Sequence, residues 1–245
     1  MCNGYRFLVV HQVAEMGCEM SAVEGDHEQP HILICHVNVS DVAQMATHLA
    51  ADVLDTSWIM SLDPRSQRAY RKTVADTAAH LASLFRKAAD AGTVGSEFGE
   101  LMVSMGASKA LEVVFSHTAL PISELWKAQV SGNEGFDFHT ICPARVIHFG
   151  EAKYSANSNP YSDAAEQAEH FLEEEKHLRD TPHLINLVPD GMDELDRDAW
   201  GVVIAFSLDA QRPLNVLRHA VERAQELARI NNSRAVVIVG VSHDD

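Results

Sequence analysis

The spacing of apolar residues along the chain predicts strands at both ends and amphipathic helices between them. In the N-terminal half, apolar residues recur three or four positions apart over long stretches, the pattern of helices with one buried face. The polar segment 24–30 predicts an exposed loop. The elements predicted as far as residue 105 are strands at 5–13 and 31–39 and helices at about 41–54, 64–90 and 94–105, the last ended by Gly106.

The second half of the chain alternates predicted helices with strands, which favours an α/β protein. Residues 107–118 fit either a continued helix or a strand. A break at residues 91–93 predicts a boundary between an N-terminal α/β region, 1–91, and a second domain, 92–245. The further elements are strands at 122–130, 200–208 and 234–241, a central strand hairpin, helices at about 162–179 and 213–230, and an acidic loop at 189–198.

The composition is that of an ordinary globular protein, since 46% of the 245 residues are hydrophobic and 22% are charged. No run of about 18 apolar residues predicts a membrane span, and the N-terminal residues lack the basic and apolar segments of a secretion signal. The four cysteines are scattered without a CxxC pair, which argues against a zinc finger or a disulfide framework. We therefore expect a cytoplasmic protein without a membrane partner.

The net charge of −16 has the wrong sign for a protein that binds nucleic acid without a partner, because such affinity comes mostly from contacts of Lys and Arg with the phosphates. Only residues 65–87 are clearly basic. This segment is either a solvated helix face or a contact for DNA or an acidic partner. Its charged residues are Arg65, Arg68, Arg71, Lys72, Arg86 and Lys87, against one acid, Asp76.

The central hairpin is the segment with the clearest chemical potential. Side chains alternate along a strand, so Glu151 and Lys153 project from the same face, about 7 Å apart. A chain reversal near residues 142–144 would place Asp137 within a residue or two of the position opposite Glu151. Two adjacent carboxylates repel each other unless a cation lies between them. A divalent metal with a free lysine beside it is an arrangement suited to phosphodiester cleavage.

The acidic–any–Lys triplet is weak by itself, because a chain with 35 acids and six lysines contains about one by chance. A second triplet, at residues 174–176, is predicted to lie in a helix, where positions two apart point to different faces. The alternative interpretation of the hairpin is an edge-strand ion pair between Glu151 and Lys153, with Asp137 as a turn former. Histidines show no paired ligand spacing, and no P-loop, GxGxxG or GxSxG motif is present.

The order of these motifs resembles the PD-(D/E)xK nuclease superfamily and, within it, the HamA-type nuclease subunit of the Hachiman anti-phage defence system. The resemblance covers about residues 92–209, although no proline precedes Asp137. It implies a restriction-endonuclease-like core, a central mixed sheet flanked by helices, within residues 92–245. The residues that carry it are Gly99-Glu100, Leu125-Trp126-Lys127, Gly135-x-Asp137 and Gly150-Glu151-Ala152-Lys153.

The resemblance also implies a catalytic site of Asp137, Glu151, Lys153 and Glu100. The two hairpin carboxylates and the carbonyl of Ala152 would hold Mg²⁺, or alternatively Mn²⁺, with Glu100 completing the outer coordination. Lys153 would orient the attacking water or stabilise the developing charge. Helical position leaves a second possibility for the helix carboxylate, because Glu97 lies closer to the predicted apolar stripe.

By the same resemblance, the expected function is a metal-dependent DNA nuclease that acts as the effector of a defence complex. DNA would be delivered by a helicase subunit of the HamB type, in a heterodimer, which fits the acidic charge and the missing ATP-binding motif. Two alternatives remain open. One is a non-catalytic interaction subunit with a decayed nuclease fold, and the other is a stand-alone restriction-type nuclease or an RNase.

Overall fold

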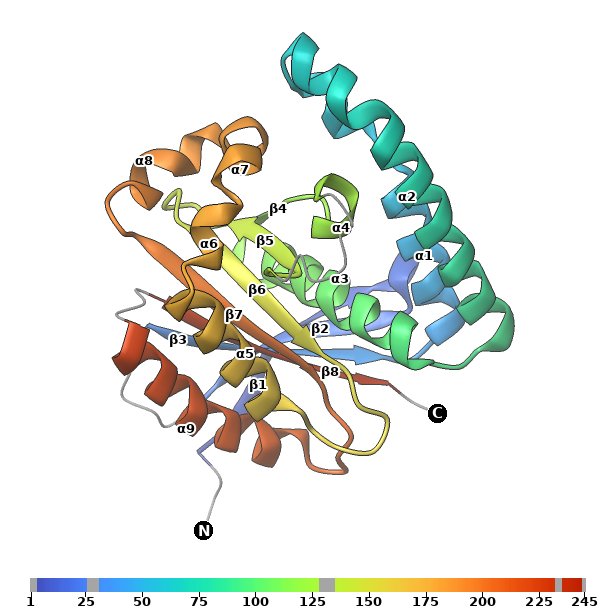
Figure 1. Ribbon diagram of the computed structural model, residues 1–245. Helices are drawn as coiled ribbons and strands as arrows, with labels where there is room; N and C mark the ends of the chain where they lie inside the picture. The colour runs from blue at the N-terminus through green and yellow to red at the C-terminus, as the bar shows by residue number, and fades with distance from the viewer. Residues whose placement is uncertain (1–3, 26–30, 128–134, 232–234, 244–245) are drawn as a thin grey trace.

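A single eight-stranded mixed sheet forms the centre of the molecule (Figure 1). The computed structural model describes residues 4–25, 31–127, 135–231 and 235–243. The strands lie in the order β1-β2-β3-β8-β7-β6-β5-β4. Their bounds are β1 Arg6–Val13, β2 Cys18–Glu24, β3 Ile32–Val39, β4 Thr118–Ala119, β5 Phe138–Ile141, β6 Ile147–Lys153, β7 Trp200–Ser207 and β8 Ala235–His243.

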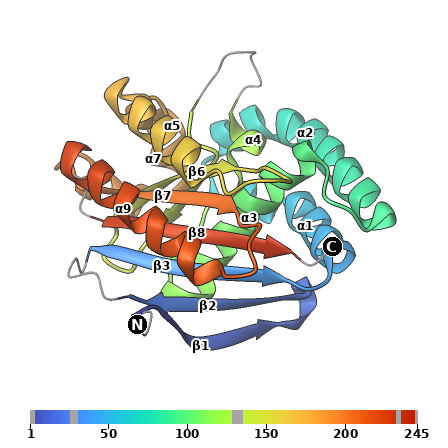
Figure 2. The ribbon, with the colours of Figure 1, turned by 90° about the horizontal axis from the view of Figure 1, so that it is seen from below.

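Four parallel strands, β3, β8, β7 and β6, make the middle of this sheet, and antiparallel pairs extend it on both sides. Figure 2 shows the order β7, β8, β3, β2, β1 across the sheet. The parallel strands are buried on both faces, which explains why β7 and β8 are almost continuously apolar. The carboxyl ends of β6 and β7 therefore lie side by side.

Helices cover both faces of the sheet and bury two separate apolar clusters. One cluster joins α1, α2 and α3 to their face of the sheet, and the other joins α5 and α9 to the opposite face (Figure 1). The α-helices are α1 Val42–Leu54, α2 Pro64–Ala91, α3 Ser96–Phe115, α4 Ser123–Trp126, α5 Tyr161–Glu173, α6 Lys176–Arg179, α7 Thr181–Leu187, α8 Met192–Leu195 and α9 Pro213–Asn231. Short 3₁₀ turns are at Ala14–Met16, Ser57–Ser61 and Pro189–Gly191.

The mixed α/β class predicted from the sequence is confirmed, and the helices predicted at about 41–54 and 64–90 begin within one residue of the predicted positions. The Asp41 carboxylate accepts a hydrogen bond from the Gln44 N–H, and Asp63 caps α2 in the same way ahead of Pro64. The sequence prediction missed β2, which follows a left-handed turn at Gly17. The alternation of apolar and polar residues over Cys18-Glu19-Met20-Ser21 is a strand signal that could have found it.

Two predictions between residues 94 and 130 are wrong. The third helix does not end at Gly106 but continues to Phe115, because a glycine inside a packed helix costs only about 1 kcal/mol and here lies against Met45. Residues 107–115 are therefore helix. The predicted strand at 122–130 is instead the short helix α4 at its start, and residues 128–130 lie outside the described residues.

In the C-terminal half the predicted hairpin, both apolar strands and the last helix are confirmed. The predicted helix 162–179 is wrong as one element, because Glu175 adopts a left-handed conformation (φ 55°) that separates α5 from α6. The second acidic–any–Lys triplet therefore lies at this break rather than inside one helix. The region predicted as an acidic loop at 189–198 also contains the turn of α8.

The segments on either side of the predicted boundary near residue 92 share one sheet. β3 pairs with β8 along its whole length, from Ile32 opposite Val236 to Val39 opposite His243. The break itself lies at Gly92, which ends α2 in a left-handed conformation. Among the described residues, none of the helices has both the length and the apolar character that a bilayer crossing requires.

Candidate active site

The β5–β6 hairpin holds its shape through the contact between Phe138 and Gly150. A Cβ atom at Gly150 would lie 2.3 Å from Cζ of Phe138, so the ring packs directly on the backbone of β6. The chain reverses at Cys142, whose N–H donates to the carbonyl of Val146 at 3.0 Å. This register brings the start of β5 beside the end of β6.

Asp137 is hydrogen-bonded to the residues on both sides of Glu151. Its N–H donates to the carbonyl of Gly150 at 2.9 Å, and its Oδ2 accepts from the N–H of Ala152 at 2.8 Å. Glu151 is fully buried, and its Oε1 accepts from Nζ of Lys153 at 2.8 Å. The structure therefore brings Asp137, Glu151 and Lys153 together. The backbone N–H and carbonyl of a strand residue point to the same side, so the Ala152 carbonyl also faces the Asp137 edge.

α3 reaches this edge because a glycine lets it pack against the end of β6. A Cβ atom at Gly99 would lie 2.4 Å from Cγ of Tyr154, and the Tyr154 hydroxyl donates to the carbonyl of Val94 at 3.2 Å. Glu100 follows in the sequence and is exposed, and its charge acts on the pKa of both Asp137 and Glu151. Glu97 lines a surface hollow beside α2 instead. The electrostatics favour Glu100 of the two helix carboxylates.

Glu124 is a fourth carboxyl group at this edge, and the sequence did not single it out. It lies on α4, which is fastened to the start of β5: the Ser123 N–H donates to the Asp137 carbonyl at 3.1 Å, and the Ser123 hydroxyl donates to the Phe136 carbonyl at 2.9 Å. The Oε2 atom of Glu124 is buried without a hydrogen-bond partner. The Pro-Ile-Ser-Glu segment offered no periodic signal, because α4 is a single turn.

The buried carboxyl groups of the cluster lie near one another, and their pKa values are raised as a result. Burial, opposed by the Ala152 N–H and Lys153, raises the pKa of Asp137 to about 6. Burial and then the Asp137 charge raise the pKa of Glu124 to about 7 and the pKa of Glu151 well above its usual value. Burial opposes charge on Lys153, but the carboxylates around it outweigh that effect and raise its pKa. Lys153 therefore stays an ammonium group.

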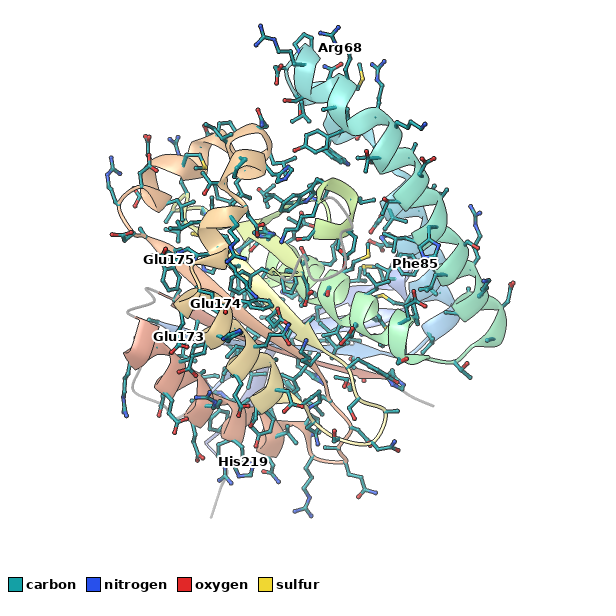
Figure 3. The ribbon with its side chains drawn as sticks, viewed as in Figure 1. Arg68, Phe85, Glu173, Glu174, Glu175 and His219 are labelled. Carbon is teal, nitrogen blue, oxygen red and sulfur yellow. The ribbon has the colours of Figure 1, made fainter. Side chains whose placement is uncertain are left out.

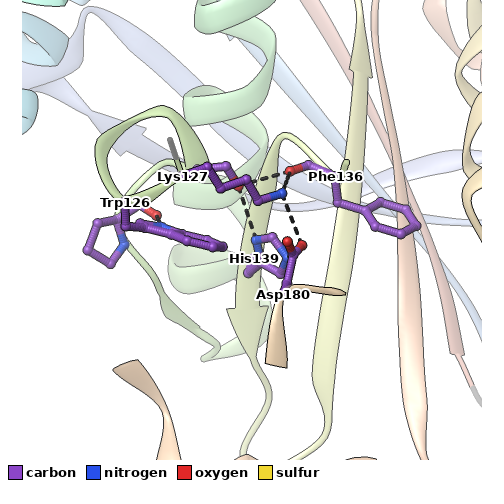
Figure 4. A network of polar contacts seen from close by, with 7 residues as sticks. Trp126, Lys127, Phe136, His139 and Asp180 are labelled. Carbon is purple, nitrogen blue, oxygen red and sulfur yellow. Dashed lines mark hydrogen bonds and ion pairs between the residues drawn. The ribbon is translucent and has the colours of Figure 1, made fainter. Parts of the chain in front are cut away.

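A second polar network joins residues on either side of Asp137 to α6 and α7 through Asp180 (Figure 4). Nζ of Lys127 donates to the carbonyl of Phe136 at 2.8 Å and pairs with Oδ2 of Asp180 at 3.0 Å. Nε2 of His139 lies 3.0 Å from the same Oδ2 atom. Burial opposes ionisation of Asp180, but the hydrogen bond from His139, followed by Lys127, lowers its pKa. This network fixes the backbone immediately before Asp137.

The chemistry of the cluster fits a divalent cation. Four carboxyl groups lie near only two ammonium groups, Lys153 and Lys127, and Lys127 is also paired with Asp180. Full ionisation would thus leave an excess of at least two negative charges. The Oε2 atoms of Glu151 and Glu124 are buried and lack partners, as oxygen donors awaiting a cation would be. Among the described residues, however, no three acidic, histidine or cysteine side chains are already arranged around one metal position.

Protein-family models, curated proteins and solved structures were compared with the chain, and none of them matches it. The function of the cluster is therefore inferred from its own geometry and electrostatics.

Proposed function

We propose that this chain is a metal-dependent nuclease that hydrolyses phosphodiester bonds of DNA at the Asp137–Glu151–Lys153 cluster. The observation that carries the proposal is Glu151, which is 0% exposed and has one oxygen without a partner. Lys153 pairs with the other oxygen, so the second oxygen is buried without compensation, at a cost of about 1 to 3 kcal/mol or more for a charged group. An ion pair kept only for stability would satisfy both oxygens.

Each residue has a role that its position supports. Asp137, Glu151 and the Ala152 carbonyl would hold Mg²⁺ or Mn²⁺, with Glu100 in the outer coordination; the ion, when bound, lowers the pKa of water and neutralises phosphate charge. Glu124 lies close enough to Asp137 for their charges to interact and belongs to the same binding group. Lys153, held by Glu151, presents a compact positive charge that can orient a water or stabilise the phosphorane.

The finer fold assignment and the partner belong to the same proposal. A hairpin with Asp immediately before one strand and Glu-x-Lys on the next, beside a helix carboxylate, supports a restriction-endonuclease-like core. The acidic chain supports a partner that brings the DNA, and by resemblance this partner is a helicase of the HamB type. If the isolated chain cleaved DNA as fast as the complex, this dependence on a partner would be wrong.

The direct test is hydrolysis of DNA and RNA with Mg²⁺, with Mn²⁺ and with EDTA, by the chain alone and with its partner. We expect metal-dependent cleavage of DNA, reduced at least about 100-fold in Lys153→Ala and in Glu151→Gln. Glu173→Gln at the exposed end of α5 is the matched control and should cleave normally (Figure 3).

Thermal unfolding separates metal binding from catalysis. Mg²⁺ at about 100 times its Kd should stabilise the wild type by about 2.7 kcal/mol and should not stabilise Glu151→Gln. The alternative, a non-catalytic subunit, predicts two results. The chain would not bind Mg²⁺, and Asp137→Ala, Glu151→Ala and Lys153→Ala would each retain biological activity. Cleavage of RNA alone would replace the DNA assignment.

A further inference from the structure

The first half of α2 carries the most concentrated positive charge of the described chain. Within residues 64–75 there are four basic side chains and no acid, although the whole protein has a net charge of −16. All four side chains are exposed. We call this set the basic ridge, and its members are Arg65, Arg68, Arg71 and Lys72.

The basic ridge contributes little to the stability of its own helix beyond one hydrogen bond, from Nε of Arg68 to the carbonyl of Pro64 at 3.3 Å. Cations near a helix N-terminus interact unfavourably with the helix dipole, and the first turn of α2 has no acid to offset them. In the part of the chain that the structure describes, none of the four makes an ion pair; Arg65 only lies near the capping carboxylate of Asp63. Basic residues that served only to balance nearby acids would form ion pairs with those acids.

The ridge projects from the body of the protein while the other side of the same helix is anchored near the cluster. Figure 3 shows Arg68 at the projecting end of α2, and Phe85 farther along the helix lies in the core. The Tyr70 hydroxyl is hydrogen-bonded to Nδ1 of His183 on α7, and the His183 ring lies 5.2 Å from that of Trp126 on α4. The ridge is thus attached to the helix that carries Glu124.

We propose that the basic ridge binds the sugar–phosphate backbone of the nucleic acid substrate. This inference depends on the proposed nuclease function. The cluster itself is acidic and repels a polyanion, so binding energy must come from cations elsewhere on the chain. From Arg65 to Lys72 the helix rises about 10 Å, the length of about three nucleotides of one B-form strand. Guanidinium groups match phosphate oxygens in geometry as well as they match carboxylates, so the regular spacing of phosphates along a strand is what favours nucleic acid here.

The test uses Arg68→Gln/Lys72→Gln, which removes two charges from one stripe of the ridge, in the Lys153→Ala background so that the probe is not cleaved. The control is Arg86→Gln/Lys87→Gln, which removes two exposed charges about 27 Å farther along the same helix. Binding of a short fluorescein-labelled DNA, single-stranded and duplex, is measured by anisotropy from about 50 to about 200 mM salt.

We expect the ridge variant to bind about 10-fold or more weakly at low salt and to lower the slope of log K against log salt by about 1.4 to 1.8. The control pair should change neither quantity. Equal losses in both variants, or none in the ridge variant, would overturn the inference. Loss of binding to a labelled poly-glutamate probe with nucleic acid binding intact would assign the ridge to an acidic protein instead.

Failure of the nuclease function gives a different pattern. Ridge-dependent binding without hydrolysis by the Lys153-containing chain would retain the ridge and reject the catalytic proposal. Hydrolysis that is unchanged in Arg68→Gln/Lys72→Gln, with unchanged binding, would retain the nuclease and reject the ridge. Circular dichroism and thermal unfolding are the controls for folding, and we expect both variants to be folded because the substituted positions are exposed.

Discussion

At the scale of single residues, the unusual feature is a set of neighbouring acids whose pKa values are raised by burial. Burial raises the pKa of Asp137 to about 6 and that of Glu124 to about 7, and it raises the pKa of Glu151 well above its usual value. Such values place proton release in the range where a metal would compete with protons for the same oxygens. Stability and pH are therefore linked at these side chains, and the proposed metal binding would be linked to both.

The pKa of Glu124 sets a pH dependence of stability with a defined sign. The folded-state pKa is above the ordinary value, so the stability that the protonated form contributes is complete below about 4.5 and is lost as pH rises through about 7. Glu124→Gln resembles the protonated form. We expect its free energy of unfolding, relative to wild type, to rise by about 1 to 3 kcal/mol between pH 5 and pH 8 without metal.

Denaturant unfolding of the wild type and of Glu124→Gln between pH 5 and pH 8 measures this difference in free energy. Subtraction also removes the contribution of the buried histidines, because both proteins share them. Burial lowers the pKa of His36, His117 and His148 to about 4, so these rings act in the opposite direction and destabilise the folded protein as pH falls. Glu173→Gln is the control, since that side chain is exposed. A pH-independent difference for Glu124→Gln would show that its carboxyl is not buried beside Asp137.

Lys127 provides a second test at the residue scale. Lys127→Met leaves the Phe136 carbonyl and the Asp180 carboxylate without their ammonium partner in a nearly dry site. We expect a loss of about 3 kcal/mol in the free energy of unfolding, and slower cleavage because the backbone before Asp137 is no longer held. Arg6→Met breaks an exposed pair with Glu24 and should cost less than about 1 kcal/mol. Equal effects in urea unfolding would contradict the proposed support.

At the scale of elements, the cluster depends on how closely α3 approaches the end of β6. The ring of Tyr154 occupies the space above Gly99, and this contact carries Glu100 to the carboxyl cluster. α4 is brought in by its hydrogen bonds to residues 136 and 137. Two helices, α3 and α4, therefore meet at the β5–β6 hairpin.

Gly99→Ala tests this docking contact. Alanine normally stabilises a helix by up to about 1 kcal/mol relative to glycine. Here its Cβ would lie 2.4 Å from a ring carbon of Tyr154, so α3 or the ring must move. We expect a net loss of about 1 to 3 kcal/mol in stability and a loss of Mg²⁺-induced stabilisation.

The matched control is Gly106→Ala on the same helix, where the new Cβ meets only the flexible end of Met45 at 3.3 Å. Its stability should remain near that of wild type or rise slightly. Thermal unfolding with and without Mg²⁺ compares the two variants. The docking explanation would be wrong if Gly99→Ala were as stable as Gly106→Ala and were stabilised by Mg²⁺ to the same extent.

At the scale of the whole molecule, one sheet joins both ends of the chain. β8, the last strand, pairs with β3 from the N-terminal segment on one side and with β7 on the other. The apolar cluster under α1, α2 and α3 also includes residues of β7 and β8. The predicted boundary near residue 92 can thus be tested as a folding question.

We expect fragment 92–245 alone to lack a cooperative thermal transition, because removal of β3 exposes a long apolar edge on β8. The complementary fragment 1–91, produced together with it, should restore a folded complex, since the cut falls in the exposed turn at Gly92. Calorimetry and size-exclusion chromatography measure both outcomes. A cooperative transition of fragment 92–245 by itself would support two independent domains.

Most of the secondary structure could be predicted where the signal was local. The caps at Asp41 and Asp63 and the alternation in β6 depend on neighbouring residues, so pattern reasoning located them. At Gly106 the prediction was wrong because tertiary packing outweighed the local preference of glycine. At Glu175 it was wrong because the tertiary structure interrupts a regular helix pattern. Single-turn helices such as α4 are too short for any periodicity.

The sequence by itself determined the α/β class and the juxtaposition of Asp137, Glu151 and Lys153, because a hairpin converts short sequence separation into contact. Only the tertiary structure decided that Glu124 joins these residues, that Lys127 and Asp180 support them, and that β3 lies beside β8. Those contacts connect segments far apart in the sequence. The unpaired oxygens and raised pKa values arise from burial, which depends on every layer packed around the site.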